Sequence, residues 1–387
     1  MNKFKFYFIL FVTTVVIFSC SKDDDSNDTI VPLRDYQTQY NSEIIIIEKY
    51  LNSNYITVTN TPGETSDQDV VISKITNPAT QPSLMSYTSN AYKGSTVFPQ
   101  LWSKIVQQDG VNYKLYYLVL REGTKDAITN LGGISPCNVD GVLTSYKGTY
   151  LYETAATAAS ASEVAAVTFE EAKHPNSTLS LLETITGWGE VFPEFKTGSY
   201  IAHKVNDKPD GTIDYSGFGA GVMFLPSGLA YYNTGSASIP SYSPLVFSFK
   251  LYDIQRLDQD GDGIPSYLED LNGDNYVRIL PLGSYNPDDT DKDGLPDFYD
   301  IDDDGDNYIT RIETQYINPS DPNKTIRYYP FNGALADDKI TPYDDPKTLY
   351  VDESKGIPAY SADGNPDYFT SKRLRIHLDK DHHTATP

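Results

Sequence analysis

The stretch Phe-Leu-Pro-Ser-Gly-Leu-Ala-Tyr at residues 224–231, followed by Leu-Val-Phe-Ser-Phe-Lys-Leu at residues 245–251, decides the fold. An apolar run that stops at Pro226-Ser227-Gly228 indicates a strand that ends in a turn. Asn233-Thr234-Gly235 indicates a loop, and the β-branched and aromatic residues of 245–251 indicate a closing strand. This part of the chain therefore predicts a strand, a proline turn, a glycine-bearing loop with Ile239-Pro240, and a second strand.

Further motifs lie upstream of this stretch. Residues 185–192 read Ile-Thr-Gly-Trp-Gly-Glu-Val-Phe, residues 145–148 read Ser-Tyr-Lys-Gly, and residues 168–171 read Thr-Phe-Glu-Glu. In residues 112–122, Tyr113, Leu115, Tyr117 and Val119 recur at every second position, which places them on one face and predicts a half-buried strand. Strand and turn signals then continue to about residue 255.

Taken in this order, the motifs resemble the FKBP-type peptidyl-prolyl cis-trans isomerases over residues 111–255. The resemblance implies an α+β fold: a twisted antiparallel sheet wrapped around a short helix, with the tryptophan of residues 185–192 in that helix. It places the functional site between the helix and the sheet. No single motif is decisive, but their shared order is hard to obtain by chance.

The resemblance also implies the roles of individual residues. Four aromatic rings would line a proline pocket, two isoleucines would form its walls, and an acidic residue and a tyrosine would supply polar groups. In that order these are Tyr146, Phe169, Trp188 and Phe247, then Ile185 and Ile239, then Glu170 and Tyr231. The Ile185 backbone N–H and the Tyr231 hydroxyl would bind substrate carbonyls.

Such a pocket needs neither a nucleophile nor a cofactor, and its partners are proline-containing polypeptides. Rotation about an X–Pro bond is slow because amide resonance imposes a barrier of roughly 18–20 kcal/mol. The planar amide is more charge-separated than the twisted one, so a dry aromatic pocket favours the twisted form. We therefore expect a peptidylprolyl isomerase (rotamase) that assists folding of exported proteins.

Two alternatives remain open. The aromatic residues can be the plain core of a β domain, or the pocket can belong to a non-catalytic proline-binding surface or adhesion protein. Four departures from the family bear on this choice: Glu170 replaces the usual aspartate, residues 149–168 are long, and Tyr232 stands where glycine is frequent. In the fourth, residues 179–182 are offset, so that Leu179 or Leu181 stands in for the family's second pocket phenylalanine.

Residues 34–110 form a predicted N-terminal extension. Apolar residues spaced by three and four predict a helix at residues 34–53, and the Thr- and Pro-rich residues 55–95 predict irregular structure with short strands. The alanine-rich residues 155–166 predict a helical or mobile insertion.

Residues 256–320 carry a second chemical signal, in which acidic residues recur at loop positions one, three, five and twelve. Ca²⁺ takes six to eight hard oxygen ligands, and alternate residues of a tight loop converge on one point. The three predicted ligand sets are Asp258, Asp260, Asp262 and Glu269; Asp289, Asp291, Asp293 and Asp300; and Asp302, Asp304, Asp306 and Glu313. Asp270, Asn272 and Asp274 form a partial fourth set.

These repeats resemble thrombospondin type 3 or dockerin-like calcium modules, which implies structural Ca²⁺. The alternative is a solvated acidic linker. Residues 321–387 form a C-terminal region for which the sequence predicts no role.

The first twenty residues predict export. Two lysines precede an apolar run that is too short to span a bilayer, and Ile17-Phe18-Ser19-Cys20 resembles a lipobox. Residues 1–19 are then a signal peptide, Cys20 is lipidated, and residues 20–33 are a tether. The acidic residues after Cys20 resemble the surface-export signal of Bacteroidota lipoproteins, which places the chain at the outer membrane, on the cell surface. The alternatives are a plain signal peptide with a chance cysteine and a disordered acidic linker.

The composition excludes several classes of protein. The formal net charge of −23 argues against nucleic acid as a partner, because phosphates would be repelled. With Cys20 lipidated, Cys137 has no intrachain partner and no disulfide framework is possible. The oligomeric state is not predicted.

Overall fold

The computed structural model describes residues 33–157, 161–205, 208–317, 322–329, 356–362, 366–368 and 374–383. The predicted signal peptide, Cys20 and nearly all of the predicted tether lie outside these residues. Within the described part of the chain, no helix combines the length and apolar character needed to cross a bilayer.

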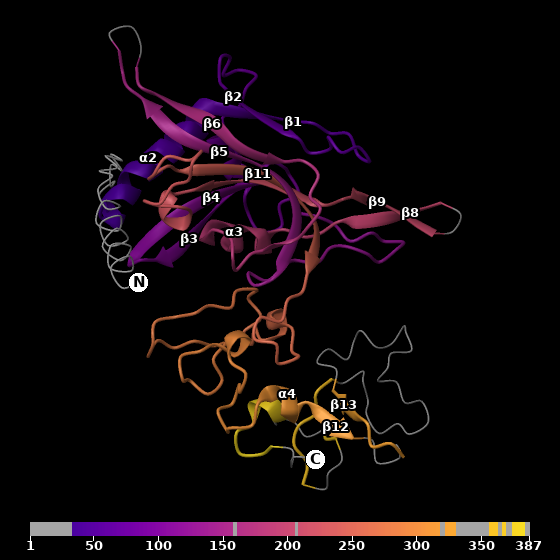
Figure 1. The fold of residues 1–387 in the computed structure, drawn as a ribbon. Helices are drawn as coiled ribbons and strands as arrows, with labels where there is room; N and C mark the ends of the chain where they lie inside the picture. Colours follow the sequence, from indigo (N-terminus) through magenta and orange to yellow (C-terminus); the bar gives the residue numbers. More distant parts are fainter. Residues whose placement is uncertain are drawn as a thin grey trace, which may run out of the picture. The chain divides into compact units, whose positions relative to one another are not determined.

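A curled antiparallel sheet of seven strands forms the centre of the fold (Figure 1). Its order is β3 (Gln100–Gln108), β4 (Val111–Arg121), β10 (Gly219–Leu225), β11 (Leu245–Gln255), β5 (Gly141–Thr154) and β6 (Glu163–Ala172), with β7 (Leu179–Ser180) paired to the start of β5. β10 and β11 contain the two stretches that opened the sequence analysis, and they pair from Gly219↔Leu251 to Leu225↔Leu245. The structure contains many strands and few helices, which is compatible with the predicted α+β class.

The sheet begins earlier than residue 111. β3 pairs with β4 along its whole length, from Gln100↔Val119 to Gln108↔Val111. The strand therefore belongs to the same sheet as the motifs, although the sequence resemblance starts after it.

One face of the sheet holds the short helix α3 (Thr186–Val191) and the turn η2 (Phe192–Glu194). Odd-numbered residues of β4 and β11 point to this side, as the period of two in a strand requires. They form one core with the helix, and its fully buried members include Leu115, Leu225, Leu251, Val191 and Phe192. The predicted short helix inside a curled sheet is thus present.

The other face of the sheet is covered by the N-terminal extension. The predicted helix is confirmed as α2 (Tyr36–Ser53), whose N-cap Asp35 accepts a hydrogen bond from the Thr38 N–H at 2.8 Å. Helix α2 and the turn η1 (Leu84–Asn90) bury side chains against even-numbered residues of β4 and β10, in a core that includes Ile47, Leu51, Leu84, Leu118, Val222 and Phe224. Both faces of the central strands are therefore buried.

Two smaller hairpins flank the sheet. β1 (Asn54–Val58) pairs with β2 (Val70–Lys74), which agrees with the short strands predicted in this region. β8 (Ser199–Val205) and β9 (Lys208–Ser216) form a hairpin that projects away from the sheet (Figure 1).

The prediction of a helical or mobile insertion at residues 155–166 is wrong where the structure describes it. β6 starts at Glu163, and its register with β5 includes Thr154↔Glu163 and Leu151↔Ala166. Pairing with β5 gives the alanines their backbone hydrogen bonds and overrides their high intrinsic helix propensity.

After β11 the described residues form only short elements. These are η4 (Ser266–Leu268), η5 (Asp297–Tyr299), α4 (Thr310–Glu313), the paired strands β12 (Gln315–Ile317) and β13 (Ile326–Tyr328), and η8 (Ile376–Leu378). The single turns η4 and η5 follow Pro265 and Pro296, which oppose regular flanking helices.

Helix α2 is fixed to the sheet by a buried carboxylate. Glu43 is 1% exposed and accepts hydrogen bonds from the Ser227 N–H at 2.7 Å, the Ser227 hydroxyl at 2.5 Å and the Gln39 amide at 2.6 Å. Ser227 belongs to the turn η3 (Ser227–Leu229), which leads to the predicted pocket residue Tyr231.

We predict that Glu43→Ala lowers the free energy of unfolding by about 2–4 kcal/mol, because three buried donors lose their acceptor. Urea denaturation followed by circular dichroism measures this change. Glu64→Ala removes an exposed carboxylate as a control and should leave the unfolding midpoint nearly unchanged. Equal midpoints for the two variants would contradict the role given to Glu43.

Candidate functional site

Three aromatic rings from separate elements meet between α3 and the sheet. Tyr146 comes from β5, Trp188 from α3 and Phe247 from β11. Their ring centroids lie 5.0 Å apart for Tyr146 and Trp188, 5.3 Å for Trp188 and Phe247, and 6.3 Å for Tyr146 and Phe247. All three contacts are edge-to-face, a favourable arrangement of aromatic pairs. The structure therefore brings these predicted residues together.

A β-bulge places Phe169 and Glu170 on this same side of the sheet. Glu170 pairs with Gly148 and Thr168 with Thr149, so Phe169 is the extra residue of the bulge. The Phe169 ring lies over Gly148 and packs edge-to-face on Phe247, with centroids 5.6 Å apart. Gly148 is required here because a Cβ at this position would lie 2.4 Å from Phe169 Cζ.

The rings border a pocket of about 420 Å³. Six of the eight predicted pocket residues line it: Tyr146, Glu170, Ile185, Trp188, Tyr231 and Phe247. Leu179, one of the two candidates for the second pocket phenylalanine, also lines it. The sequence analysis did not assign the remaining lining residues, which are Glu183, Thr184, Thr186 and Ala230. Phe169 instead packs behind Phe247, and Ile239 is 5% exposed within the core next to the pocket. These two residues therefore support the pocket without lining it.

The polar groups of the pocket are two phenols and one carboxylate. Burial, together with a hydrogen bond to Glu170 and its negative charge, raises the pKa of Tyr146 to about 12. Burial and the charge of Glu170 also raise the pKa of Tyr231. Both hydroxyls therefore stay protonated at neutral pH and can donate hydrogen bonds. Although its side chain is longer than that of the usual aspartate, Glu170 reaches the Tyr146 hydroxyl.

Two further features concern backbone and indole donors. Ile185 precedes α3 as its N-cap, and within the described residues no acceptor takes its N–H. The indole N–H of Trp188 is buried and also lacks an acceptor among the described residues. Buried donors without partners are rare and concentrate where a ligand or a special environment is involved.

The ring contacts of Tyr232 explain why a tyrosine stands where the family frequently has glycine. Its φ of +42° lies in the left-handed region, where glycine is the usual residue. The side chain stacks on Tyr36 of α2 at 4.4 Å and contacts Tyr242 edge-on at 5.0 Å. Helix α2 thus holds the loop that presents Tyr231.

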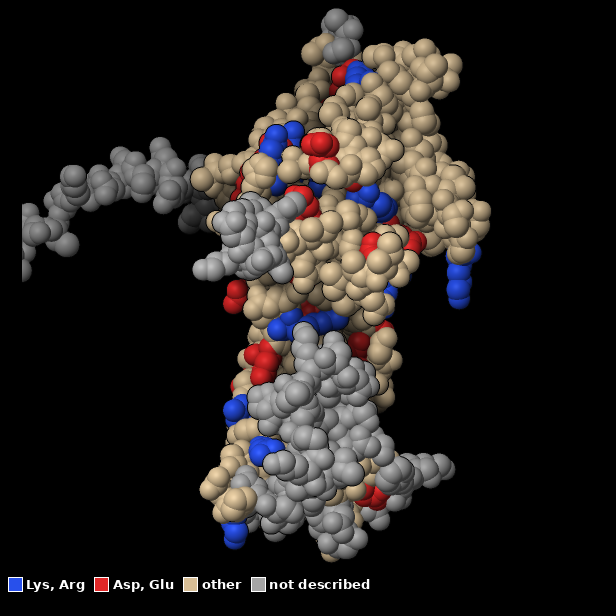
Figure 2. All heavy atoms as spheres, turned by 90° about the vertical axis from the view of Figure 1, so that its right-hand side faces the viewer, with Lys and Arg blue, Asp and Glu red and all other residues tan. Residues whose placement is uncertain are grey.

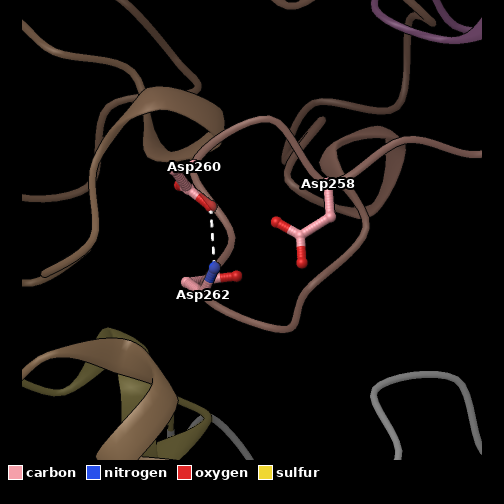
Figure 3. Close-up of side chains that lie close together, drawn as sticks. All are labelled: Asp258, Asp260 and Asp262. Atoms are coloured by element: carbon pink, nitrogen blue, oxygen red, sulfur yellow. Dashed lines mark hydrogen bonds between the residues drawn. The ribbon is translucent and has the colours of Figure 1, made fainter.

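The acidic repeats share one backbone geometry. In the first loop, Asp258 accepts hydrogen bonds from the N–H groups of Gly261 and Gly263, and Asp260 accepts one from Asp262 at 3.1 Å (Figure 3). Asp289, Asp302 and the partial set at Asp270 accept equivalent hydrogen bonds. The turn residues Gly263, Asn275, Gly294 and Asn307 all have positive φ. The three predicted loops and the partial fourth set therefore share this turn geometry.

Carboxylate oxygens converge in these loops. Three groups contain the first three members of each predicted set, without its position-twelve residue: Asp258, Asp260 and Asp262; Asp289, Asp291 and Asp293; and Asp302, Asp304 and Asp306. In each group one ligand atom per residue lies within 4.8 Å of the others. Glu313 is 1% exposed beside the third group, and both of its carboxylate oxygens lack a hydrogen-bond partner.

A fourth group joins two loops and was not predicted as such. It consists of Asp262, Glu269 and Asp303, which are 2%, 2% and 1% exposed. Both oxygens of Glu269 and of Asp303 are buried without a hydrogen-bond partner. Asp303 was missed because it stands at an even position of its loop, and only contact with a distant loop reveals it. Four unpartnered buried oxygens fit a bound cation, since buried charges are otherwise paired.

On the face drawn in Figure 2, lysine and arginine side chains alternate with aspartate and glutamate, and neither sign covers a continuous area.

Comparisons with known proteins match separate parts of the chain. The family model of the BamM C-terminal region (BamM_C) matches residues 259–342. A peptidyl-prolyl cis-trans isomerase structure from Pseudomonas syringae pv. tomato aligns with 44% of this chain and 90% of its own, at 18% identity and a TM-score of 0.25. FkpA from Escherichia coli aligns at 22% identity and a TM-score of 0.21, over 36% of this chain and 48% of its own, so the chain spans about half of FkpA. TM-scores of this size assign neither a fold nor an activity. A search of curated proteins finds no match.

We predict that Gly148→Ala costs about 1–3 kcal/mol of stability, because the new Cβ displaces the Phe169 ring from Phe247. Chemical denaturation measures the cost. Gly141→Ala in the same strand is the control, since the nearest atom to its Cβ is 3.3 Å away. A Gly148→Ala protein as stable as the control would contradict this packing.

The acidic segment also predicts a pH dependence. Burial, then neighbouring carboxylates, raise the pKa of Glu269 to about 10 and that of Asp303 to about 11 in the cation-free protein. A carboxyl whose pKa is higher in the folded than in the unfolded chain stabilises the fold only while protonated. Cation-free stability should therefore fall as the pH rises above about 4.

Bound Ca²⁺ would replace these protons, so we predict that millimolar Ca²⁺ raises Tm more at about pH 8 than at about pH 5. Thermal unfolding in Ca²⁺ and in chelator measures both values. A Tm that ignores Ca²⁺ at both pH values would show that the loops bind no cation.

Proposed function

We propose that residues 100–255 form an FKBP-like peptidyl-prolyl isomerase domain that acts on proline-containing segments of exported proteins. The observation that carries this proposal is the edge-to-face arrangement of Tyr146, Trp188 and Phe247 at a 420 Å³ pocket. The same pocket contains the predicted Ile185 and Tyr231. The short helix against one face of the curled antiparallel sheet, which the resemblance implies, supports the same assignment.

In this proposal the pocket binds the pyrrolidine ring against the aromatic side chains. The Ile185 N–H and the Tyr231 hydroxyl are available to hold the substrate carbonyls, because neither donates elsewhere among the described residues. Glu170 orients the Tyr146 hydroxyl. A pocket poor in water lowers the energy of the twisted amide relative to the planar one, and each ~1.4 kcal/mol gained is a tenfold increase in rate.

We further propose that the acidic segment binds structural Ca²⁺ through the four carboxylate groups. Bound Ca²⁺ would supply positive charge to buried carboxylates that otherwise repel one another. The loops bury few apolar residues of their own, so cation binding would stabilise a segment with little regular secondary structure.

The site of action follows from the signal peptide and lipobox resemblance at residues 1–20. We propose a lipid-anchored protein of the outer membrane that faces the cell exterior. Its clients would then be proteins folding after export.

The isomerase proposal predicts that Trp188→Ala and Tyr231→Phe each lower kcat/KM at least about tenfold, a loss of ~1.4 kcal/mol in transition-state stabilisation. A protease-coupled assay on peptides with one X–Pro bond measures the rate. Tyr152→Phe is the control for the loss of a hydroxyl, because Tyr152 is 44% exposed and lies outside the pocket.

Absence of rate acceleration by the calcium-loaded wild type would refute the isomerase. If peptides then still bound and changed Trp188 fluorescence, the pocket would serve a proline-binding module. Absence of both would leave the aromatic residues as core.

A further inference from the structure

The pocket helix α3 carries a buried carboxylate whose partners come from two distant segments. Glu190 is 3% exposed and forms two hydrogen bonds with the Arg278 guanidinium, at 2.5 and 3.2 Å, and an ion pair with Lys104 at 2.9 Å. Burial opposes its ionisation, but the two cations outweigh burial and hold the pKa of Glu190 below its usual value. Arg278 belongs to the acidic segment that follows the sheet domain.

Tyr276, two residues before Arg278, binds the end of the same helix. Its hydroxyl donates to the Glu190 carbonyl at 3.2 Å and to the Glu194 carboxylate at 2.8 Å. Lys104 Nζ lies 3.4 Å from the centroid of the Tyr276 ring. Three charged or polar contacts thus join residues 276–278 to α3 and η2, within the unit Asp35–Pro387.

Both backbone groups of Val277 form hydrogen bonds with the side-chain amide of Asn138. The Asn138 side chain donates to the Val277 carbonyl at 2.8 Å and accepts from the Val277 N–H at 2.9 Å. Asn138 Cβ also lies 3.8 Å from where a Cβ would stand on Gly189 of α3. The Val277 side chain is buried in a small core with Cys137, Val139 and Phe298.

The loop between β7 and α3 has two sides. Leu182 packs against the Val277 core, while Glu183, Thr184 and Ile185 line the proline pocket. A shift of the Val277 core would therefore reach the Ile185 N–H through a few residues of backbone.

The Val277 core also contacts the acidic loops. Asn275 is the turn residue of the loop whose Asp270 accepts hydrogen bonds from the N–H groups of Gly273 and Asn275. Phe298 lies in η5, next to the buried Asp297. Val277 follows this partial loop, which is not among the converging groups, whereas Phe298 lies between the groups at Asp289 and Asp302. Because Phe298 and Val277 are buried in the same small core, that core connects the converging carboxylates to Val277.

Helix α3 needs such outside support. It has six residues and no side-chain N-cap hydrogen bond, and a helix this short is not stable by itself. Its orientation is set by its tertiary contacts: the apolar core on one side, and Arg278, Tyr276 and Asn138 on the other.

We propose that Arg278 and Val277 are positioning residues of the proline pocket, through which cation binding by the acidic loops orients Trp188 and Ile185. This inference rests on the proposed function of the pocket and of the loops. The proposed substrate and reaction are unchanged by this inference. It adds that residues of the cation-binding segment position the side chains of the pocket.

The test follows Trp188 directly. In a Trp102→Phe background Trp188 is the single tryptophan, so its fluorescence emission reports on the environment of the pocket that it lines. Calcium titration should change this emission in the otherwise wild-type protein. Arg278→Gln should abolish most of that change and lower kcat/KM about fivefold or more, while the calcium heat measured by calorimetry stays within about twofold of wild type. Arg278→Lys, which keeps the charge, should restore part of both effects.

Lys324→Gln is the matched control, because it removes one positive charge from an exposed side chain that lies outside the acidic loops. It should respond to calcium as the parent does. Val277→Ala provides a second variant should Arg278→Gln unfold, and it should weaken the Trp188 response in the same direction.

The outcomes separate the proposals. Calcium heat without any Trp188 response, or an Arg278→Gln protein that behaves like Lys324→Gln, would overturn the positioning role. Absence of calcium heat would instead remove the cation proposal on which it rests. An inactive wild type with an intact Trp188 response would remove only the isomerase.

Discussion

The pocket depends on one constraint: a helix of six residues must hold Trp188 against the concave face of a curled sheet. Such a helix forms only because both of its sides are engaged. Trp188, Val191 and Phe192 bury in the sheet core, and Glu190 is held from the other side by Arg278 and Lys104. The geometry of the site is therefore a property of the sheet and of the acidic segment together.

The sequence was sufficient for elements whose pattern is local. Alternation in β4 and β11 and the three-four spacing in α2 follow from the burial of one face, so their ranges could be predicted. The bulge at Phe169 and the burial of Ile239 could not, because both depend on how neighbouring strands and loops pack. Tyr232 looked like a departure from the family until its contact with Tyr36 of α2 was known.

In the acidic loops, too, the features set by local sequence could be predicted and those set by contacts between distant segments could not. Odd-numbered aspartates and a turn residue with positive φ specify each loop locally, which is why three ligand sets were predictable. Asp303 meets Glu269 and Asp262 only through contact between loops far apart in sequence. No spacing rule within one loop reports such a contact, and the same holds for Arg278 beside Glu190.

Coverage of the sheet by α2 and η1 has a consequence for how the chain is divided. β4 and β10 bury side chains on both faces, and β3 protects one edge of β4. A fragment that starts at residue 111 would lose that edge strand and leave Leu118, Val222 and Phe224 in water, conditions that favour intermolecular strand pairing. The smallest autonomous folding unit therefore starts at α2, and the N-terminal segment is a structural component of the pocket domain instead of a spacer.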